Sequence, residues 1–536
     1  MRTASAEAEP PLPKSSYIAP NIAQAFAHYQ QGRLADAETI CNAILAAEPE
    51  QFDALHLLSL LRHAQERNVE ALQVVGAVLK RAPRSAEVLS NYGLILAALS
   101  RHEEALACFD EALHHSAGYL NALQNRAAAL KSLARDEEAL VAFEAILAAK
   151  SDDVGALNEC GGLHMTLGRP GAAIACYDRA LAVAPRLVEL HVNKGSALGA
   201  ANRFAEALES FGAATAIEPQ CADAHHRASL IRLRSGDFKR GWRDYEWRWR
   251  TGRALKRREM TAPLWLGAQP IQGKTILLLA EQGFGDTINF ARYAPLVAAL
   301  GATVILDVPS PLKEIAASVP GIALVLEDGE PVPPVDFYCP LMSLPLACQT
   351  EIGTIPANIP YIRPHAERLA KWRARLPRNG RLRIGLCWAG SSAHLNDHNR
   401  SIAIERFAGI LSLSNLDFIS VQKEVSEPQA AFLRQHRVVE LGQDFENFAD
   451  TAAALAELDL LISVDTSVAH LAGAMGKAVA LLLPLPAEWR WLLDRSDSPW
   501  YPTMRLFRQT AIGDWDGPLA QLHEELGTVA ARRPVL

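Results

Sequence analysis

The 536-residue sequence predicts a multidomain protein in which an all-helical superhelical array precedes an α/β module made of two parallel-sheet halves. Two observations predict this fold class. Small residues recur every 34 residues through the first half of the chain, a period typical of stacked helical hairpins. After Pro263 the pattern changes to short apolar runs that alternate with helical segments, as expected of βαβ units.

Two ladders of residues at 34-residue spacing define the helical repeat. Alanine holds the small position in six consecutive units, at Ala37, Ala71, Ala105, Ala139, Ala173 and Ala207. An aromatic residue follows four positions later, at Phe109, Phe143, Tyr177, Phe211 and Tyr245. Small residues let two antiparallel helices approach, and the aromatic ring is expected to fill space against the next pair. The pattern resembles the tetratricopeptide repeat, with about seven units over residues 18–252.

The resemblance implies a concave groove that binds a peptide or protein partner. In this family the sixth position of each unit faces the groove, and here it holds Asn91, Asn125 and Asn193, with Glu159 between them. Each amide offers a donor and an acceptor for an extended backbone. We therefore expect exposed asparagines that bind the partner. Asparagine is also common at this position without such a role, and that alternative stays open.

The junction after the array combines three tryptophans with several arginines. A basic patch with aromatic residues is one interpretation, since such patches bind single-stranded nucleic acid. The other is that Trp242, Trp247 and Trp249 dock the last repeat helix on the next domain. Trp242, Tyr245 and Trp249 are spaced to share one helical face, which favours docking.

Composition excludes several classes of protein. The formal net charge is -7 with acids and bases mixed, so no nucleic-acid partner is expected. Residues 1–17 lack the apolar segment of a signal peptide and are predicted to form a disordered leader. The most apolar stretch, Leu460 to Leu485, is interrupted by charged residues, so no membrane span is predicted. The eight cysteines form no CxxC pair, so no zinc site is predicted. Most of them lie in apolar patterns, where free cysteine acts as a small hydrophobe, which favours a reducing, cytoplasmic location.

The α/β module is expected to contain buried parallel strands. Six continuous apolar runs predict them, at Thr275–Ala280, Thr303–Val308, Arg383–Trp388, Asp417–Val421, Leu460–Val464 and Ala478–Leu483. Such runs are continuous because helices cover both faces of the sheet. A break near residues 355–383 divides the module into two Rossmann-like halves, 273–365 and 366–536, after a linker over 253–272. A ligand is then expected between the halves, at the carboxyl ends of the strands.

Two strand-to-helix turns carry candidate chemistry. The first strand ends in the glycine-rich turn EQGFGDT, which places Asp286 at the mouth of a cleft. This turn is not a complete GxGxxG motif, and taken alone Asp286 is more typical of a helix cap. A later strand ends in VDTSVAH, where the N–H groups at Thr466 and Ser467 would form an anion nest, with His470 one helical turn beyond. Taken alone, His470 is more typical of a hydrogen-bonded core histidine.

Together these turns resemble the heptosyltransferase-like branch of the GT-B glycosyltransferases, a family 9-like module, over roughly residues 270–520. The family's Gly-Asp turn matches Gly285-Asp286. Its Asp-Thr-Gly-x-x-His turn matches residues 465–470, with Ser467 in place of glycine, where serine adds a donor of its own. Arg400 matches the basic residue that the family places near the donor diphosphate.

The resemblance implies a role for each of these residues. Asp286 is expected to be the general base that deprotonates the acceptor hydroxyl. Donor-binding residues are expected at Arg400, Gln422, Lys423, Asp465, Thr466, Ser467 and His470. A carboxylate opposite a held diphosphate suits an inverting reaction without a metal or cofactor, in which the nucleotide sugar is a substrate. If Asp286 is not the base, His394 and Asp397 in the adjacent loop are the next candidates.

The predicted function is sugar transfer from a nucleotide-sugar donor to a protein or glycan acceptor recruited by the array. The layout resembles that of protein O-GlcNAc transferases, in domain order alone. Two alternatives stay open: a non-catalytic scaffold with a retained GT-B domain, and a nucleotide-sugar epimerase. The anion nest argues against the first and a peptide-binding array against the second. One DxD, Asp514 and Asp516, is a weak metal candidate in the C-terminal tail.

Overall fold

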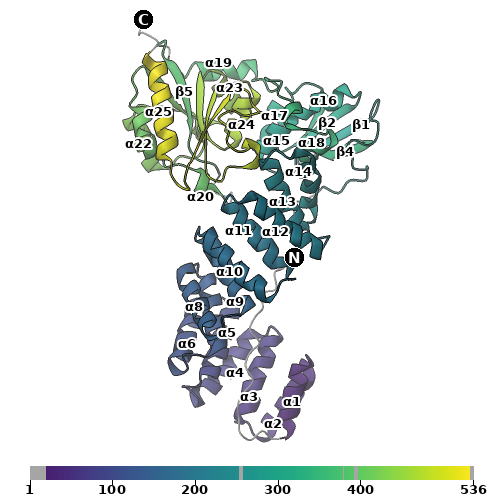
Figure 1. The fold of residues 1–536 in the computed structure, drawn as a ribbon, viewed down its shortest axis with the longest axis vertical. Helices are drawn as coiled ribbons and strands as arrows, with labels where there is room; N and C mark the ends of the chain where they lie inside the picture. The colour runs from purple at the N-terminus through teal and green to yellow at the C-terminus, as the bar shows by residue number, and fades with distance from the viewer. Residues whose placement is uncertain (1–19, 253–257, 378, 392–395, 532–536) are drawn as a thin grey trace. The chain divides into compact units, whose positions relative to one another are not determined.

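The computed structural model describes residues 20–252, 258–377, 379–391 and 396–531. The predicted leader, most of the cationic stretch after residue 252, and His394 lie outside these residues. The chain divides into two compact units, Met1–Ala224 and His225–Leu536 (Figure 1). Each unit is described by itself.

The N-terminal unit is helical throughout its described residues. Its helices are α1 (Pro20–Gln30), α2 (Leu34–Ala47), α3 (Phe52–Ala64), α4 (Asn68–Arg81), α5 (Ala86–Ala98), α6 (His102–His115), α7 (Leu120–Ser132), α8 (Asp136–Ala149), α9 (Val154–Thr166), α10 (Pro170–Val183), α11 (Val188–Ala200) and α12 (Phe204–Ile217). Consecutive helices stack as hairpins, as the array predicts (Figure 1).

The small and aromatic ladders explain this packing. The six ladder alanines are all 0% exposed. A Cβ atom on Gly93 would lie 2.6 Å from the Phe109 ring, and one on Gly161 would lie 2.4 Å from the Tyr177 ring. Phe109 and Tyr177 therefore pack against a glycine of their own hairpin, and Phe109 also shares a hydrophobic cluster with Ala129 of the next helix pair. At these two crossings glycine leaves room for the ring.

The C-terminal unit begins with a helical hairpin and a first sheet. Its elements are α13 (Ala222–Arg234), which starts at the unit boundary, α14 (Phe238–Tyr245), η1 (Glu246–Arg250), β1 (Thr275–Leu279), α15 (Phe284–Phe290), η2 (Ala291–Tyr293), α16 (Ala294–Ala299), β2 (Thr303–Val308), η3 (Ser310–Leu312), α17 (Lys313–Ala316), β3 (Ile322–Glu327), β4 (Phe337–Pro340), η4 (Leu341–Ser343), α18 (Leu344–Ala347) and η5 (Ile352–Thr354).

A second sheet follows. Its elements are α19 (Ala366–Arg373), β5 (Leu382–Cys387), α20 (Asp397–Arg400), η6 (Ile404–Phe407), α21 (Ala408–Leu411), β6 (Leu416–Ser420), α22 (Glu427–Gln435), β7 (Val439–Glu440), η7 (Gly442–Asp444), α23 (Phe448–Ala456), β8 (Leu460–Val464), α24 (Ser467–Ala474), β9 (Val479–Leu483), η8 (Trp489–Trp491), β10 (Met504–Arg508) and α25 (Asp516–Ala531).

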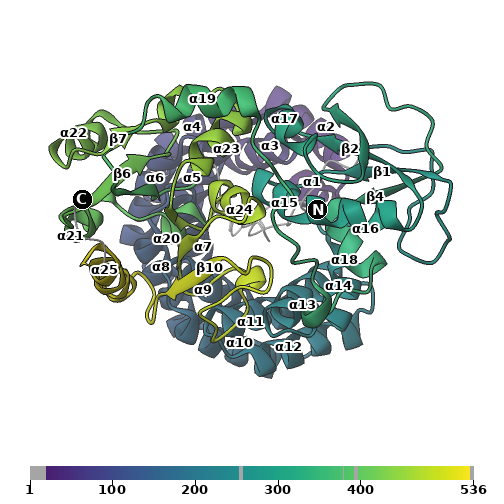
Figure 2. The ribbon, with the colours of Figure 1, turned by 90° about the horizontal axis from the view of Figure 1, so that it is seen from above.

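Both sheets are parallel, and their strand orders fix where a ligand can bind. The first sheet has the order β3-β2-β1-β4 and the second β10-β9-β8-β5-β6-β7. Strand order therefore reverses between β1 and β4 in the first sheet and between β5 and β8 in the second. Open α/β sheets bind ligands in the crevice outside the carboxyl ends of the strands at such a switch point. Figure 2 shows α15 and α24 side by side between the two sheets.

The junction hairpin belongs to the core of the C-terminal unit. Trp242 is buried and packs edge-on against Trp489, with ring centroids 5.2 Å apart, and against Phe290 at 6.2 Å. Docking through Trp242 is therefore confirmed. Trp247 is only partly buried and stacks on His225 at 4.2 Å within the same hairpin.

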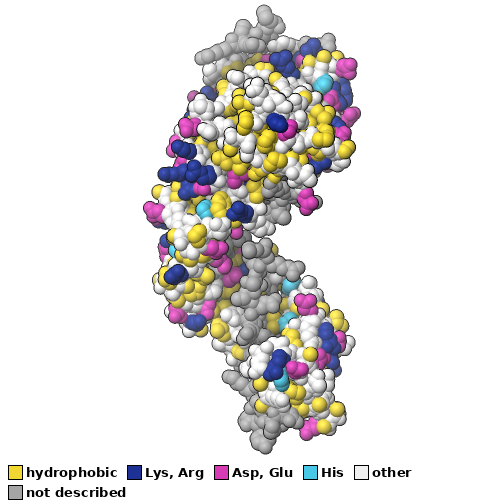
Figure 3. Space-filling model, turned by 90° about the vertical axis from the view of Figure 1, so that its right-hand side faces the viewer, with side chains coloured by type: hydrophobic (Ala, Val, Ile, Leu, Met, Phe, Trp, Pro, Cys, Tyr) yellow, Lys and Arg dark blue, Asp and Glu magenta, His cyan; other side chains and the backbone are white. Residues whose placement is uncertain are grey.

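The surface carries mixed charge. Acidic and basic side chains lie side by side on the face shown in Figure 3, in line with the interspersed charges of the sequence. No helix in the described part of the chain combines the length and the apolar composition needed to cross a bilayer.

Candidate functional site

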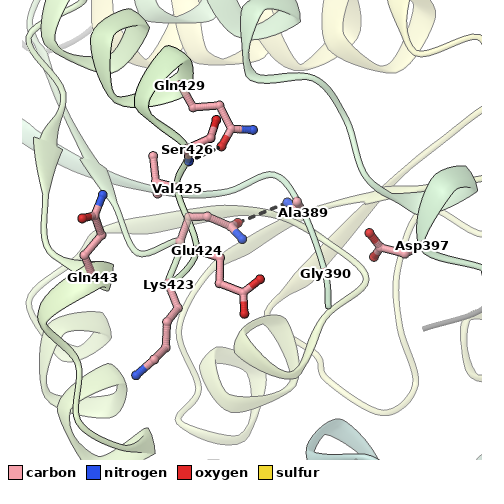
Figure 4. Close-up of a pocket in the computed structure, with 10 residues that line it drawn as sticks. Ala389, Gly390, Asp397, Lys423, Glu424, Val425, Ser426, Gln429 and Gln443 are labelled. Atoms are coloured by element: carbon pink, nitrogen blue, oxygen red, sulfur yellow. Dashed lines mark hydrogen bonds between the residues drawn. The ribbon is translucent and has the colours of Figure 1, made fainter. Parts of the chain in front are cut away.

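A cavity of about 650 Å³ opens at the carboxyl ends of β5 and β6, beside the switch point of the second sheet (Figure 4). The predicted residues Gln422 and Lys423 line it, together with Ala389, Asp397, Ser426 and Gln443. Buried Gln422 accepts a hydrogen bond from Ala389 N at 3.2 Å, which ties the end of β6 to the loop after β5. The Lys423 ammonium donates to the Phe445 carbonyl.

The turn after β8 provides the N-terminus of α24. Thr466 is the N-cap residue, yet its hydroxyl does not cap the helix and lies 3.2 Å from Ser463 Oγ, inside the sheet. The Thr466 side chain is therefore turned away from the position predicted for a phosphate. Ser467 begins the helix and is half-buried. The N–H groups of this first turn remain the available donors.

Arg400 lies against this turn. Its Nη1 donates to the Asp465 carbonyl at 3.0 Å, and its Nε donates to Asp397 at 3.1 Å. A Cβ atom on Gly390 would lie 2.3 Å from Arg400 Nη2, so the loop after β5 passes close to the guanidinium. The structure thus brings together a cation and a helix N-terminus, as the sequence predicted. Asp397, the next candidate for the base after Asp286, forms an ion pair with Arg400.

Asp286 lies in the first turn of α15. Its Oδ2 accepts from Gly283 N at 3.0 Å, so it does serve as a helix cap. Its Oδ1 accepts from Arg490 Nη2, and its side chain is 23% exposed. A Cβ atom on Gly285 would lie 2.8 Å from His470 Cδ2, so glycine lets the start of α15 approach α24. The two predicted turns therefore face each other across the halves of the unit.

His470 is buried between these turns. Its Nδ1 lies 3.0 Å from the Tyr501 hydroxyl, and its ring stacks on Trp491 at 5.4 Å. Burial, followed by the charges of Arg490, Arg292 and Arg400, lowers the pKa of His470 well below its ordinary value. The ring is therefore neutral near pH 7. Its burial and its hydrogen bond are those of a core histidine, and it contributes to an anion site only as a neutral group.

Sequence reasoning missed the loop between β9 and β10. Arg490 pairs with Asp286 and, at 2.8 Å, with Glu488, and its guanidinium lies 4.2 Å from the Trp489 ring centroid. Burial opposes its charge, but Glu488 and Asp286 outweigh burial and raise the pKa of Arg490. Trp491 Nε1 donates to Asp465 at 2.8 Å.

Asp465 is held by this loop, and burial raises its pKa. The only local signal for the loop is an arginine between two tryptophans in an apolar stretch.

The predicted groove asparagines differ in their surroundings. Asn91 is 1% exposed and bonds His56 at 2.8 Å, so the expectation of an exposed side chain is wrong there. Asn193 is half-buried and donates to Asn158 at 2.9 Å. Asn125 is also half-buried. Two of the three amides thus pair with polar side chains of the preceding repeat.

The DxD motif lies at the start of α25, where Asp514 Oδ1 accepts from Asp516 N at 3.1 Å. Within the described ranges, no group of three His, Cys, Asp or Glu side chains is arranged to hold a metal ion.

Comparisons with known proteins support the repeats. A family model for the tetratricopeptide repeat matches residues 22–75, 64–119 and 192–241. Protein FlbA of Caulobacter vibrioides is 25% identical over 330 residues, which are 57% of this chain and 55% of FlbA. The chain thus spans about half the length of this relative.

Similar solved structures are repeat proteins. A tetratricopeptide repeat protein from Parabacteroides merdae is 19% identical, with a TM-score of 0.35, and covers 43% of this chain and 92% of its own. A thermophilic tetratricopeptide repeat protein from Thermus thermophilus is 23% identical, with a TM-score of 0.29. The match covers 33% of this chain and 97% of the Thermus protein. YrrB, described as having an unusual peptide-binding site, is 21% identical, with a TM-score of 0.30. The match covers 33% of this chain and 92% of YrrB. The matching family model and the observed sheets show that the chain joins tetratricopeptide repeats to a C-terminal region of parallel sheets and helices.

Proposed function

We propose that the C-terminal unit is a GT-B glycosyltransferase that moves a sugar from a nucleotide-sugar donor to an acceptor recruited by the repeats. One observation carries the proposal. The N-terminus of α24 and Arg400 meet at the switch point of the second sheet, and Gly285 brings the Asp286 turn against them. The adjacent cavity of about 650 Å³ has the size of a small-molecule site.

In the proposed reaction, the acceptor oxygen forms a bond to the anomeric carbon while the bond from that carbon to the diphosphate breaks. The electron pair leaves with the nucleoside diphosphate, whose charge Arg400 and the N–H groups of α24 would stabilise. The hydroxyl proton passes to the Asp286 carboxylate. Neutral His470 would donate or accept one hydrogen bond and supply no charge.

The nucleotide would lie in the cavity beside Gln422 and Lys423. Lys423 would exchange its backbone carbonyl partner for a ligand oxygen, and the Gln422 amide nitrogen would face a base or ribose. Protein or peptide binding by the repeats would deliver the acceptor, with Asn125 as the groove asparagine best placed to take part.

A second candidate function is a non-catalytic scaffold. The observation that favours it is that both Asp286 oxygens are already hydrogen-bonded within the protein, one to Gly283 N and the other to the Arg490 guanidinium. On this alternative the turns serve packing, as the capping bond of Asp286 and the buried His470 show they can.

A thermal-shift screen with UDP, GDP, ADP and dTDP sugars separates the candidates. A ligand at 100 times its dissociation constant adds about 2.7 kcal/mol of stability. A donor found this way is then labelled in its sugar and mixed with wild-type protein and acceptor. Sugar transfer supports the enzyme, donor binding without any turnover supports the scaffold, and conversion of the free donor to its epimer supports an epimerase.

A further inference from the structure

A second cavity, of about 350 Å³, lies at the carboxyl ends of β1, β2 and β4. It sits at the switch point of the first sheet, between β1 and β4, where an open α/β sheet binds ligands. None of the residues assigned above to the donor or to the base lines it. The cavity is therefore separate from the proposed donor site.

Three of the ten residues that line this cavity are acidic. Glu281 and Asp307 lie deep in the cavity, with side chains 4% and 8% exposed, and Asp328 is exposed at its mouth. Arg258 is the lining cation among the described residues. Arg248 pairs with Glu281 and Arg258 pairs with Asp307, so among the described residues Asp328 gives the lining its excess negative charge.

The two buried carboxylates, Glu281 and Asp307, differ in how many hydrogen-bond partners they have. Both oxygens of Glu281 accept from buried Arg248, at 2.9 and 3.1 Å, and Oε1 also accepts from Met342 N at 3.2 Å. Asp307 pairs with Arg258 through Oδ2 alone. Its Oδ1 is buried and has no hydrogen-bond partner among the described residues. A buried acceptor without a donor is costly, so a ligand that supplies an N–H group at this point is favoured.

From this lining we infer that the cavity binds a compact organic cation, an ammonium or a guanidinium group. A cation supplies the missing donor at Asp307 and offsets the excess charge of Asp328, whereas a neutral polyol supplies the donor alone. Trp249 and Tyr338 line the same cavity, where the Arg248 guanidinium lies 4.6 Å from the centroid of the Trp249 ring, and aromatic rings attract cations. Burial raises the pKa of Asp307 while Arg258 lowers it. A bound cation would stabilise the ionised form further.

Isothermal titration of the full chain with butylguanidinium tests the assignment, with butylurea as the neutral ligand of the same shape. Butylguanidinium is expected to bind saturably and butylurea at least about tenfold more weakly. Gly-Arg-Gly tests the source of the cation. Tighter binding of this tripeptide than of butylguanidinium assigns the site to a protein side chain, and weaker binding assigns it to a free small molecule.

Three variants test the residues. Asp307→Asn is expected to weaken butylguanidinium binding by about tenfold or more, because Asp307 is buried and hydrogen bonds to charged groups are strong. Asp328→Asn is expected to weaken it about two- to fivefold, because ion pairs at exposed positions are weaker. Asp336→Asn is the matched control, because Asp336 pairs with Lys274 at the amino end of β1 and should leave binding unchanged. Exposed Asp328 tolerates substitution, so it carries the test if the buried Asp307 variant does not fold.

Three results would overturn the inference. They are an absence of saturable butylguanidinium binding, equal binding of butylurea, and unchanged affinity in the folded Asp307 and Asp328 variants. Because the titration contains no nucleotide sugar and no acceptor, its outcome is independent of whether the unit transfers sugar.

Discussion

Arg490 and Asp286 form an ion pair that joins the two sheet-containing halves of the C-terminal unit at the candidate site. The arginine comes from the loop after β9, and the aspartate comes from the first turn of α15. Because the other oxygen of Asp286 accepts from Gly283 N, both oxygens are occupied before a substrate arrives. A base at this position must exchange one of these bonds for the acceptor hydroxyl.

Asp286→Asn is expected to lower single-turnover sugar transfer by about 10²–10⁴-fold, the usual contribution of a positioned general base. Asparagine keeps the cap on Gly283 but loses the charge that faces Arg490, whose side chain is 7% exposed. Stability should therefore fall by roughly 1–3 kcal/mol in urea unfolding. Full sugar transfer by the folded Asp286→Asn variant would remove Asp286 from the mechanism. If the variant is less stable but the wild-type protein also transfers no sugar, the scaffold is supported.

Gly285→Ala tests the close approach of the two turns. The new Cβ atom would lie 2.8 Å from the His470 ring, which cannot move freely because it is stacked on Trp491 and bonded to Tyr501. Overpacking of this kind costs about 1–3 kcal/mol. Gly353→Ala is the control, since nothing lies within 4 Å of a Cβ there. Equal melting temperatures for both variants would show that the helices are free to separate.

Ser467→Glu tests the anion site at the start of α24. Like charges brought together cost several kcal/mol, so nucleotide-sugar affinity should fall at least about tenfold in calorimetric titration. Ser414→Glu adds the same charge at an exposed position of the same half and should have no effect. Unchanged affinity in the Ser467 variant, with the donor identified by the thermal-shift screen, would place the diphosphate elsewhere.

Local patterns predicted six of the ten strands in the described residues and the turns after β1 and β8, but not β3, β4, β7 or β10. Strands β1 and β8 are continuous apolar runs because helices cover both faces. Strand β3 exposes Leu324 at the sheet edge and β7 has two residues, so neither has a buried run to detect. Asp286 and His470 could be predicted because each lies in the turn or helix that directly follows a recognisable apolar strand, β1 and β8 respectively. Nothing local pairs Asp286 with a residue 204 positions away.

Burial also decided which predicted side chains remain available. The period of the repeat predicted the helix position of Asn91, but the neighbour His56 in the preceding repeat determines that its amide is buried. Thr466 likewise has the expected position at the helix start, while Ser463 and Cys387 draw its hydroxyl into the sheet. A motif specifies a position along the chain, and the packing around it specifies the direction of the side chain.

His56→Gln tests the pH dependence of the repeat array. Burial lowers the pKa of His56 to about 4 from an unfolded value of 6.5, so below pH 6.5 the unfolded state binds more protons than the folded state. Stability is therefore lost as the pH falls from 6.5 towards 4, by up to about 1.4 kcal/mol per pH unit for this one group. Urea unfolding at several pH values should show a shallower slope in the variant. An unchanged slope would mean that His56 is protonated in the folded array.

Alanine variants of the groove asparagines distinguish a role in the stability of the array from a role in partner binding. Asn91→Ala removes a buried bond to His56 and should lower the stability of the array by about 1–3 kcal/mol. Asn125→Ala removes a half-buried amide and should leave stability within about 0.5 kcal/mol, as surface changes usually do. If the amide ladder binds an extended backbone, Asn125→Ala alone should weaken capture of the native partner in a pull-down at equal folded fraction. If Asn91→Ala loses partner capture only in proportion to its lost stability, and Asn125→Ala captures the partner as well as wild type does, the asparagines serve packing between repeats.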